Sequence, residues 1–333
     1  MSAAARQVDR SHRLLDEALV WDNHGCLPLR PHDESFLPQL RRYRDAQVDV
    51  AFINIGFGEQ GVEEHVRMLA ALRYWLRQRP DEFVLANSVE DIRRAKAEGK
   101  LAVGFDIEGM NAIADQPSLV HLYYELGVRW MLIAYNRNNR AGGGCQDEDG
   151  GLTEFGRRVI DEMTAAGMVL CCTHTGRRTA LEAIDHSPNP VIFSHSNPKA
   201  LCAHPRNIDD EMMRSCASRG GVIGLSGIGI YLGDNEASAA KLAEHIDYVA
   251  QTVGIKHVGL GLDYVFDREE LEFYIRSMPD TFPPALYSEG ITMVPPEAIP
   301  GVVEELLGRG YGDADIGAVL GGNMMRIASE VWR

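Results

Sequence analysis

The stretch LAVGFDIE, residues 101–108, is an apolar run that ends in a glutamate. Short apolar runs of this kind are typical of strands buried on both faces of a parallel sheet. The carboxylate of Glu108 is costly to bury unless it is paired with a positive group or bound to a metal. In barrels of alternating strands and helices, the side chains at the carboxyl ends of the strands meet at one mouth. The stretch therefore predicts a buried strand that brings Glu108 to such a mouth.

Similar short runs recur along the chain, and longer stretches with helical periodicity lie between them. The expected strands are Ala18–His24, Val48–Ile55, Leu101–Glu108, Trp130–Tyr135, Met168–His174, Pro190–His195, Gly221–Ser226 and His257–Asp263. Eight parallel strands with crossover helices predict an α/β fold, a (β/α)8 barrel of the TIM type. The length of 333 residues would also allow two domains, but one barrel over residues 1–333 is the simpler arrangement.

A proline-rich segment follows the last expected strand. Residues 276–300 contain Pro279, Pro283, Pro284, Pro295, Pro296 and Pro300. In a barrel, a loop at this place lies beside the active-site mouth. We expect a loop over about 276–300 that either shapes a pocket or forms an ordered part of the surface.

The charge and apolar patterning exclude several classes of protein. The 33 lysines and arginines against 48 aspartates and glutamates give a net charge of −15, which repels phosphate backbones and argues against nucleic-acid binding. The longest uncharged run, residues 220–233, is shorter than the roughly 20 apolar residues of a membrane-spanning helix. The N-terminus lacks the apolar core of a secretory signal, and the six cysteines form no CxxC pair. These features predict a cytoplasmic protein that uses neither a membrane nor a disulfide framework.

Side chains that can bind metals stand at the ends of five expected strands. They are His24 with Cys26 shortly after it, Glu108, His174, His195 and Asp263. Because the strand ends of a barrel meet at one mouth, these groups are expected to lie together. Histidine and carboxylate ligands from separate strands suit a zinc-type site that leaves a coordination position for water. The pattern therefore indicates a metal-dependent hydrolase.

Several phrases in the same regions resemble one known family. They are WDNH at 21–24, GFDIEG at 104–109, LTEFG at 152–156, VIFSHS at 191–196, HPRNI at 204–208, VGLGLD at 258–263 and LGGN at 320–323. Together they look like the membrane (renal) dipeptidase family of zinc metallopeptidases, which have amidohydrolase-type barrels. The phrases run in order over nearly the whole chain, and those around His195 and Arg206 are the most specific.

The resemblance implies a two-zinc site in which a hydroxide between the metals attacks the peptide. By similarity, His24 and the residue two positions later hold one metal, Glu108 bridges both, and His174 with His195 hold the other. Asp263 would accept the proton of the water and pass it to the departing amine. Arg206 would bind the terminal carboxylate of the substrate through its planar guanidinium.

Two positions depart from the pattern of that family. Cys26 stands where the family normally has aspartate, and a thiolate can still bind zinc through a longer bond. The alternative is a single zinc held by Glu108, His174 and His195 with Cys26 beside it, so one or two zinc ions remain open. Tyr135-Asn136 occupies the place of a histidine-asparagine pair that helps hold the substrate. A tyrosine hydroxyl can donate a hydrogen bond to the oxyanion of the reaction.

The sequence thus predicts a zinc-dependent dipeptidase for small dipeptides, and the resemblance implies tolerance of a C-terminal D-residue. Tyr135 and Asp263 are the expected catalytic residues, and Asn136 and Arg206 are expected to bind the substrate. One alternative is a related amidohydrolase or lactonase acting on another small molecule with a carboxylate, which the departures at Cys26 and Tyr135 suggest. A second is a metal or small-molecule binder without catalysis. Family members often pair, so a homodimer is compatible with the sequence.

Overall fold

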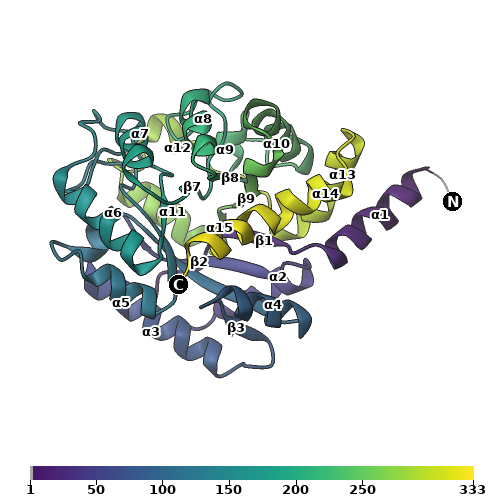
Figure 1. Cartoon of the computed structure of the whole chain (residues 1–333), viewed down its shortest axis with the longest axis horizontal. Helices are drawn as coiled ribbons and strands as arrows, with labels where there is room; N and C mark the ends of the chain where they lie inside the picture. The colour runs from purple at the N-terminus through teal and green to yellow at the C-terminus, as the bar shows by residue number, and fades with distance from the viewer. Residues whose placement is uncertain (1–2) are drawn as a thin grey trace.

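The chain forms a closed barrel of parallel strands, seen in a computed structural model that describes residues 3–333 (Figure 1). The barrel strands are β1 (Trp21–Cys26), β2 (Val50–Phe57), β4 (Leu101–Glu108), β5 (Val128–Leu132), β6 (Val169–Cys171), β7 (Ile192–Phe193), β8 (Val222–Leu225) and β9 (Val258–Leu260). Each strand pairs in parallel with the next, and Asp22 of β1 pairs with Leu260 of β9. This last pairing closes the sheet, and the predicted (β/α)8 barrel is confirmed.

Two short strands were not expected from the sequence. The strand β3 (Phe83–Leu85) pairs with the first half of β4, while the second half of β4 pairs with β5. The strand β10 (Tyr264–Val265) pairs with the end of β1. Both are too short to show an apolar period, and β10 follows β9 within the stretch that carries Asp263.

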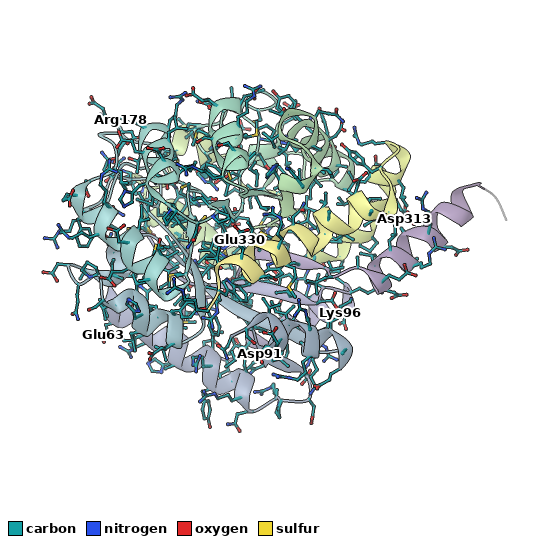
Figure 2. All side chains as sticks on the ribbon, viewed as in Figure 1. Glu63, Asp91, Lys96, Arg178, Asp313 and Glu330 are labelled. Atoms are coloured by element: carbon teal, nitrogen blue, oxygen red, sulfur yellow. The ribbon has the colours of Figure 1, made fainter. Side chains whose placement is uncertain are left out.

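Helices surround the strands on the outside of the barrel (Figure 1). They are α1 (Ala3–Glu17), α2 (Arg41–Asp45), α3 (Val62–Arg77), α4 (Val89–Ala97), α5 (Leu119–Glu125), α6 (Glu154–Ala166), α7 (Arg177–His186), α8 (Asp210–Ser218), α9 (Gly229–Leu232), α10 (Ala239–Val253), α11 (Arg268–Ser277), α12 (Pro284–Tyr287), α13 (Ile299–Gly308), α14 (Asp313–Gly317) and α15 (Asn323–Val331). Charged side chains such as Glu63 on α3 and Arg178 on α7 point outward (Figure 2). No helix within residues 3–333 is long and apolar enough to cross a membrane.

The phrase LTEFG shows how sequence sets local structure here. The Thr153 hydroxyl accepts a hydrogen bond from the backbone N–H of Gly156 at 3.0 Å and so caps the N-terminus of α6. A Cβ atom at Gly156 would lie 2.3 Å from the carbonyl oxygen of Ala141, so only glycine allows this close approach. The helix ends at Gly167, whose φ of 85° is left-handed.

Alternate residues of the strands separate an inner and an outer apolar cluster. On β4, Val103 and Phe105 pack in the cluster that includes the surrounding helices, whereas Ala102 packs with Trp21 and Trp130. Because side chains alternate along a strand, the strand residues of the second cluster face the barrel interior, where they pack with residues of α15 such as Met324 and Ile327. Asp106 and Glu108 share the inward face of β4 with Ala102. The barrel interior is therefore apolar at the start of β4 and acidic at its end.

The segment over 276–300 is not a single loop. It contains the end of α11, the short helix α12 and a single 3-10 turn at Pro296–Ala298. Phe282, Tyr287 and Val294 in this segment are buried. The prolines thus stand in and between short helical pieces that pack against the rest of the chain.

Candidate metal centre and active-site pocket

Three imidazole rings converge on one oxygen atom of Glu108. Its Oε1 atom lies 3.2 Å from Nε2 of His195, 3.3 Å from Nε2 of His174 and 3.7 Å from Nε2 of His24. The two atoms His174 Nε2 and His195 Nε2 are 3.1 Å apart. All four side chains are buried, and Oε1 has no hydrogen-bond partner among the described residues. A buried acceptor oxygen surrounded by ring nitrogens is the donor set that a cation such as zinc requires.

The outer nitrogen of each ring has its own partner. Nδ1 of His24 lies 3.2 Å from Asp106 Oδ2, Nδ1 of His174 lies 2.7 Å from Asn136 Oδ1, and Nδ1 of His195 lies 2.9 Å from Ser194 Oγ. Partners of this kind fix the ring orientation and direct Nε2 toward a metal. The arrangement of all three rings therefore fits metal binding through Nε2.

A second group of ligand atoms adjoins the first. The Sγ atom of Cys26 lies 3.4 Å from His24 Nε2 and 3.9 Å from Asp263 Oδ1, and the last two atoms are 3.6 Å apart. His24 thus belongs both to the group with Glu108 and His195 and to the group with Cys26 and Asp263. Because Nε2 of His24 can bind only one ion, the two clusters together offer either one site around His24 or two neighbouring sites that divide these groups.

Burial shifts the pKa values of four of these groups, Glu108, Cys26, His174 and His195, in the directions that oppose charge, whereas the burial of His24 is outweighed by its acidic neighbours, which raise its pKa well above the usual range. Burial raises the pKa of Glu108 to about 8 and that of Cys26 to about 12. Burial, reinforced by the positive charges of neighbouring groups, holds the pKa values of His174 and His195 well below the usual range. A bound dication inverts this effect, since it favours the carboxylate and thiolate forms.

Several residues at the mouth have strained backbones. Asn136, His174 and Asp263 have φ values of 56°, 60° and 61°, in the left-handed region that non-glycine residues rarely adopt. Each lies a few residues beyond the end of a barrel strand. Such strain persists where the surrounding structure fixes the backbone, and it gathers at functional sites.

The ligand atoms form the floor of a cleft with an empty volume of about 740 Å³. Cys26, Glu108, Tyr135, His174 and Asp263 line this floor. The walls are mainly apolar or aromatic and consist of Leu27, Leu29, Phe57, Ile228, Tyr231, Val265, Leu271, Tyr274, Phe282, Tyr287 and Ile291. Concave, largely apolar pockets with a few polar groups are typical of small-molecule sites.

Arg206 is a buried cation near this floor. Its Nη2 atom donates to the backbone oxygen of His195 at 3.0 Å, and its guanidinium lies over the ring of Tyr231 at 5.1 Å. Its Nε atom has no partner among the described residues, and no carboxylate of residues 9–333 forms an ion pair with it. A buried guanidinium of this kind can receive an anionic group of a ligand.

Comparisons with known proteins agree with the sequence phrases. The profile of the membrane dipeptidase family, peptidase family M19, matches residues 8–272. The chain belongs to the membrane dipeptidase family. It is 30% identical to dipeptidase aclJ of Aspergillus oryzae over 76% of this chain and 57% of that protein. It is 26% identical to dipeptidase ataJ of Aspergillus terreus over 87% of this chain and 70% of that protein. The match with aclJ thus spans little more than half of that relative.

Solved structures of the same shape support the fold. An amidohydrolase of Pseudomonas aeruginosa superposes with a TM-score of 0.89 at 27% identity, over 97% of this chain and 99% of that one. A metallopeptidase of Rhodobacter sphaeroides, solved with a phosphinate mimic of the dipeptide L-Ala-D-Ala, superposes with a TM-score of 0.77. Its identity is 18%, over 95% of this chain and 99% of that one, so this likeness concerns the fold.

Asn136 lies at the mouth, but its amide is already engaged. Its Oδ1 atom contacts His174 Nδ1, and its Nδ2 atom donates to the backbone oxygen of Thr281 at 3.2 Å. The side chain is fully buried. The polar atoms of Asn136 thus contact His174 and Thr281, and the binding of substrate by Asn136 stays a prediction from the sequence.

Tyr135, the second departure from the membrane dipeptidase pattern, lies against a predicted ligand. Its ring stacks on the ring of His174, with the centroids 4.0 Å apart and the planes inclined by 27°. It also lines the cleft beside Glu108. Within residues 3–333, no group forms a hydrogen bond with its hydroxyl. The hydroxyl is thus available to a ligand.

The sequence reasoning missed the residues that orient the histidines. Asp106 stands two positions before Glu108 and so shares its strand face, a spacing that could have revealed it. Ser194 directly precedes His195, and no periodic pattern in the sequence marks it as a partner of that ring. Tyr231 and Tyr287 reach the cleft from segments after β8 and within 276–300, and their hydroxyls lie 3.2 Å apart. Only the folded chain brings these two rings together.

Proposed function

We propose that this chain is a zinc-dependent dipeptidase that hydrolyses small dipeptides. The observation that carries the proposal is the convergence of three Nε2 atoms on the unpartnered Oε1 of Glu108, at the floor of an open cleft. Family membership supports the reaction class. We further propose that residues 1–333 act as one metallo-hydrolase domain, with the segment 276–300 forming part of the cleft wall through Phe282 and Tyr287.

The proposed ligands divide into two sets that share Glu108. His24 and Cys26 would hold one zinc ion, and His174 and His195 the other. Zinc at such a site supplies an acidified water and a Lewis acid for the scissile carbonyl. Two ions are proposed because Glu108 Oε1 lies near Nε2 of His24 on one side and near Nε2 of His174 and of His195 on the other, while Cys26 lies beside His24.

The remaining roles fall to residues around the floor. Asp263 Oδ2 accepts a hydrogen bond from Ser226 at 3.4 Å, which leaves Oδ1 facing His24 and Cys26. Asp263 would take the proton of the attacking water and return it to the leaving amine. Tyr135 would donate its free hydroxyl to the developing oxyanion.

Arg206 would bind the terminal carboxylate of the dipeptide. Its unpartnered Nε atom is buried and lacks a counterion among the described residues. Because the carboxylate anchors the substrate, the C-terminal side chain itself is left without a required contact. We therefore include dipeptides with a C-terminal D-residue among the proposed substrates.

The test is hydrolysis of a panel of L,L- and L,D-dipeptides by protein whose metal content is measured in parallel. One to two zinc ions per chain and cleavage of several dipeptides are expected, with loss of both in Glu108→Gln. A folded, zinc-loaded preparation that cleaves no dipeptide would refute the proposed dipeptidase activity.

A second candidate is a related amidohydrolase or lactonase for another small molecule with a carboxylate. The thiol of Cys26 and the phenol of Tyr135 favour it, since both depart from the pattern expected of the family. Lactones and N-acyl amino acids in the same panel separate the two activities. The cytoplasmic location and the homodimer stay predictions from the sequence.

A further inference from the structure

The cleft above the candidate ligands and the neighbouring cleft that contains Arg206 differ in chemical character. The wall of the first includes the aliphatic and aromatic side chains Leu27, Leu29, Phe57, Val265, Leu271 and Ile291. Leu27 and Leu29 follow Cys26 in the chain, and Val265 pairs with Cys26 through the backbone ladder. This apolar wall is therefore built directly onto the ligands of the second cluster.

A second, polar cleft adjoins the first at His174 and is lined by Arg206, Lys199 and Asp209, among others. Arg206 lies under Tyr231, and the Tyr231 hydroxyl meets that of Tyr287. Gln146 Nε2 also reaches the Tyr287 hydroxyl at 3.4 Å. A cation with hydroxyl groups around it suits an anionic substrate group and not an apolar side chain.

The apolar cleft and the polar cleft, which meet at His174, define a direction in which a dipeptide can lie. Resting on the proposed function, the carboxylate binds at Arg206 and the scissile carbonyl lies over Glu108. The residue on the amino side of that carbonyl must then extend toward Cys26, Asp263 and the apolar wall. We propose that the enzyme selects dipeptides whose N-terminal residue carries a large apolar side chain, which the apolar wall of the first cleft binds.

A further carboxylate, Glu270, lines this cleft, and both of its oxygens have partners in the chain. Glu270 Oε1 accepts a hydrogen bond from the Tyr274 hydroxyl at 3.2 Å, and Glu270 Oε2 lies 3.4 Å from Arg30 Nη1. The same arginine binds Asp267 at 2.9 Å. A cationic substrate side chain would therefore have to compete with Arg30 and with the Tyr274 hydroxyl for the oxygens of Glu270.

Helix α11 provides a place to test the proposal without disturbing the core. None of its residues is fully buried. Leu271 faces the cleft, whereas Phe273, two positions later, is 58% exposed and does not line it. Leu271→Ala and Phe273→Ala therefore form a matched pair on one helix, of which only the first alters the pocket.

The experiment compares kcat/KM for X-Gly dipeptides, where X is Leu, Phe, Ala, Asp or Lys, and for the reversed Gly-X series. We expect Leu-Gly and Phe-Gly to exceed Asp-Gly and Lys-Gly by at least about tenfold, as one apolar contact can discriminate to that degree. The Gly-X series should vary less. Leu271→Ala should reduce the preference for Leu-Gly over Ala-Gly, Leu271→Asp should raise the relative rate of Lys-Gly, and Phe273→Ala should change neither ratio.

Each other outcome has a defined meaning. If no dipeptide of either series is cleaved, the proposed function fails. Dipeptides could be cleaved with a kcat/KM that is equal across the X-Gly series, highest for Lys-Gly, or less variable than in the Gly-X series. The proposed dipeptidase activity would then be supported, and the apolar specificity would be overturned. Equal effects of Leu271→Ala and Phe273→Ala would also overturn it.

Discussion

The Sγ atom of Cys26 lies 3.4 Å from Nε2 of His24, within the group of ligand atoms that also contains Asp263. A thiol here replaces the carboxylate expected from the family. A thiolate matches the charge of that carboxylate but is a softer ligand that favours thiophilic metals. Whether Cys26 binds a metal together with His24 therefore decides whether the protein holds one zinc ion or two.

Cobalt substitution tests whether Cys26 binds metal. In the Co(II) protein, a thiolate ligand produces a charge-transfer absorption band in the near ultraviolet. We expect this band in the wild type and its loss in Cys26→Ser and Cys26→Asp. Because aspartate supplies a charged oxygen ligand, Cys26→Asp should keep two metals per chain and equal or higher activity, whereas Cys26→Ser should lose one metal.

The matched control is Cys202→Ser, since Cys202 lies outside the cleft and contacts the backbone oxygen of Ile230. Its cobalt spectrum should equal that of the wild type. A wild-type spectrum without the thiolate band, together with one metal per chain, would favour the single-zinc alternative. A Cys26→Asp enzyme with two metals and no activity would show that the thiol has another purpose.

Asn136 should tune zinc affinity through His174. Asn136→Leu removes the acceptor of His174 Nδ1, and loss of such a partner weakens metal binding by about 10- to 100-fold. Competition with a chelator measures this affinity, and excess zinc should restore much of the activity. Asn136→Asp keeps an acceptor oxygen and should retain most of the affinity. A raised KM with unchanged zinc affinity would instead support the substrate-binding role predicted from the sequence.

Tyr135→Phe isolates the role of the phenol hydroxyl. The substitution keeps the ring that stacks on His174. If the hydroxyl stabilises the oxyanion, kcat should fall about a hundredfold while KM and zinc content change little. Tyr248→Phe is the control, because it removes a hydroxyl on α10 that donates to Asp210 far from the cleft. A fall in zinc affinity with unchanged kcat at saturating zinc would show instead that Tyr135 acts by packing on His174.

The sequence predicted the strands best where they are most regular. The expected bounds of β4 agree with the structure because a run that is apolar apart from Asp106 leads into Glu108. The strands that carry His174 and Asp263 end earlier than expected, at Cys171 and Leu260. His174 and Asp263 lie three residues beyond these ends with left-handed φ values, a conformation in which aspartate and histidine are enriched but which neither residue type fixes from sequence alone.

The candidate ligands could also be predicted from the sequence, because the strand ends of a barrel converge whatever sequence lies between them. The partners of their outer nitrogens were harder to predict. Asn136 meets His174 across 38 positions of sequence, and Asp106 meets His24 across 82. These contacts depend on strand register and side-chain rotation, which a pattern of apolar residues does not specify.

His245 on α10 should make the free energy of unfolding depend on pH, independently of the metal centre. It is buried, its Nε2 atom contacts the backbone oxygen of Leu232 at 2.9 Å, and burial lowers its pKa to about 4 despite that contact and nearby Glu244. The unfolded chain, with a histidine pKa of about 6.5, binds this proton more readily than the folded chain. The contribution of His245 to the free energy of unfolding is therefore complete above pH 6.5. It is lost as the pH falls toward 4, by about 3 kcal/mol in total.

Urea unfolding of wild type and His245→Gln across this pH range measures the effect. Glutamine can still donate to Leu232 but does not titrate, so the wild type should lose stability relative to the variant as the pH falls from 7 to 4. The difference between the two proteins cancels the titration of the carboxylates and of the histidines in the cleft. A difference that stays constant with pH would show that His245 is protonated equally in the folded and unfolded chains.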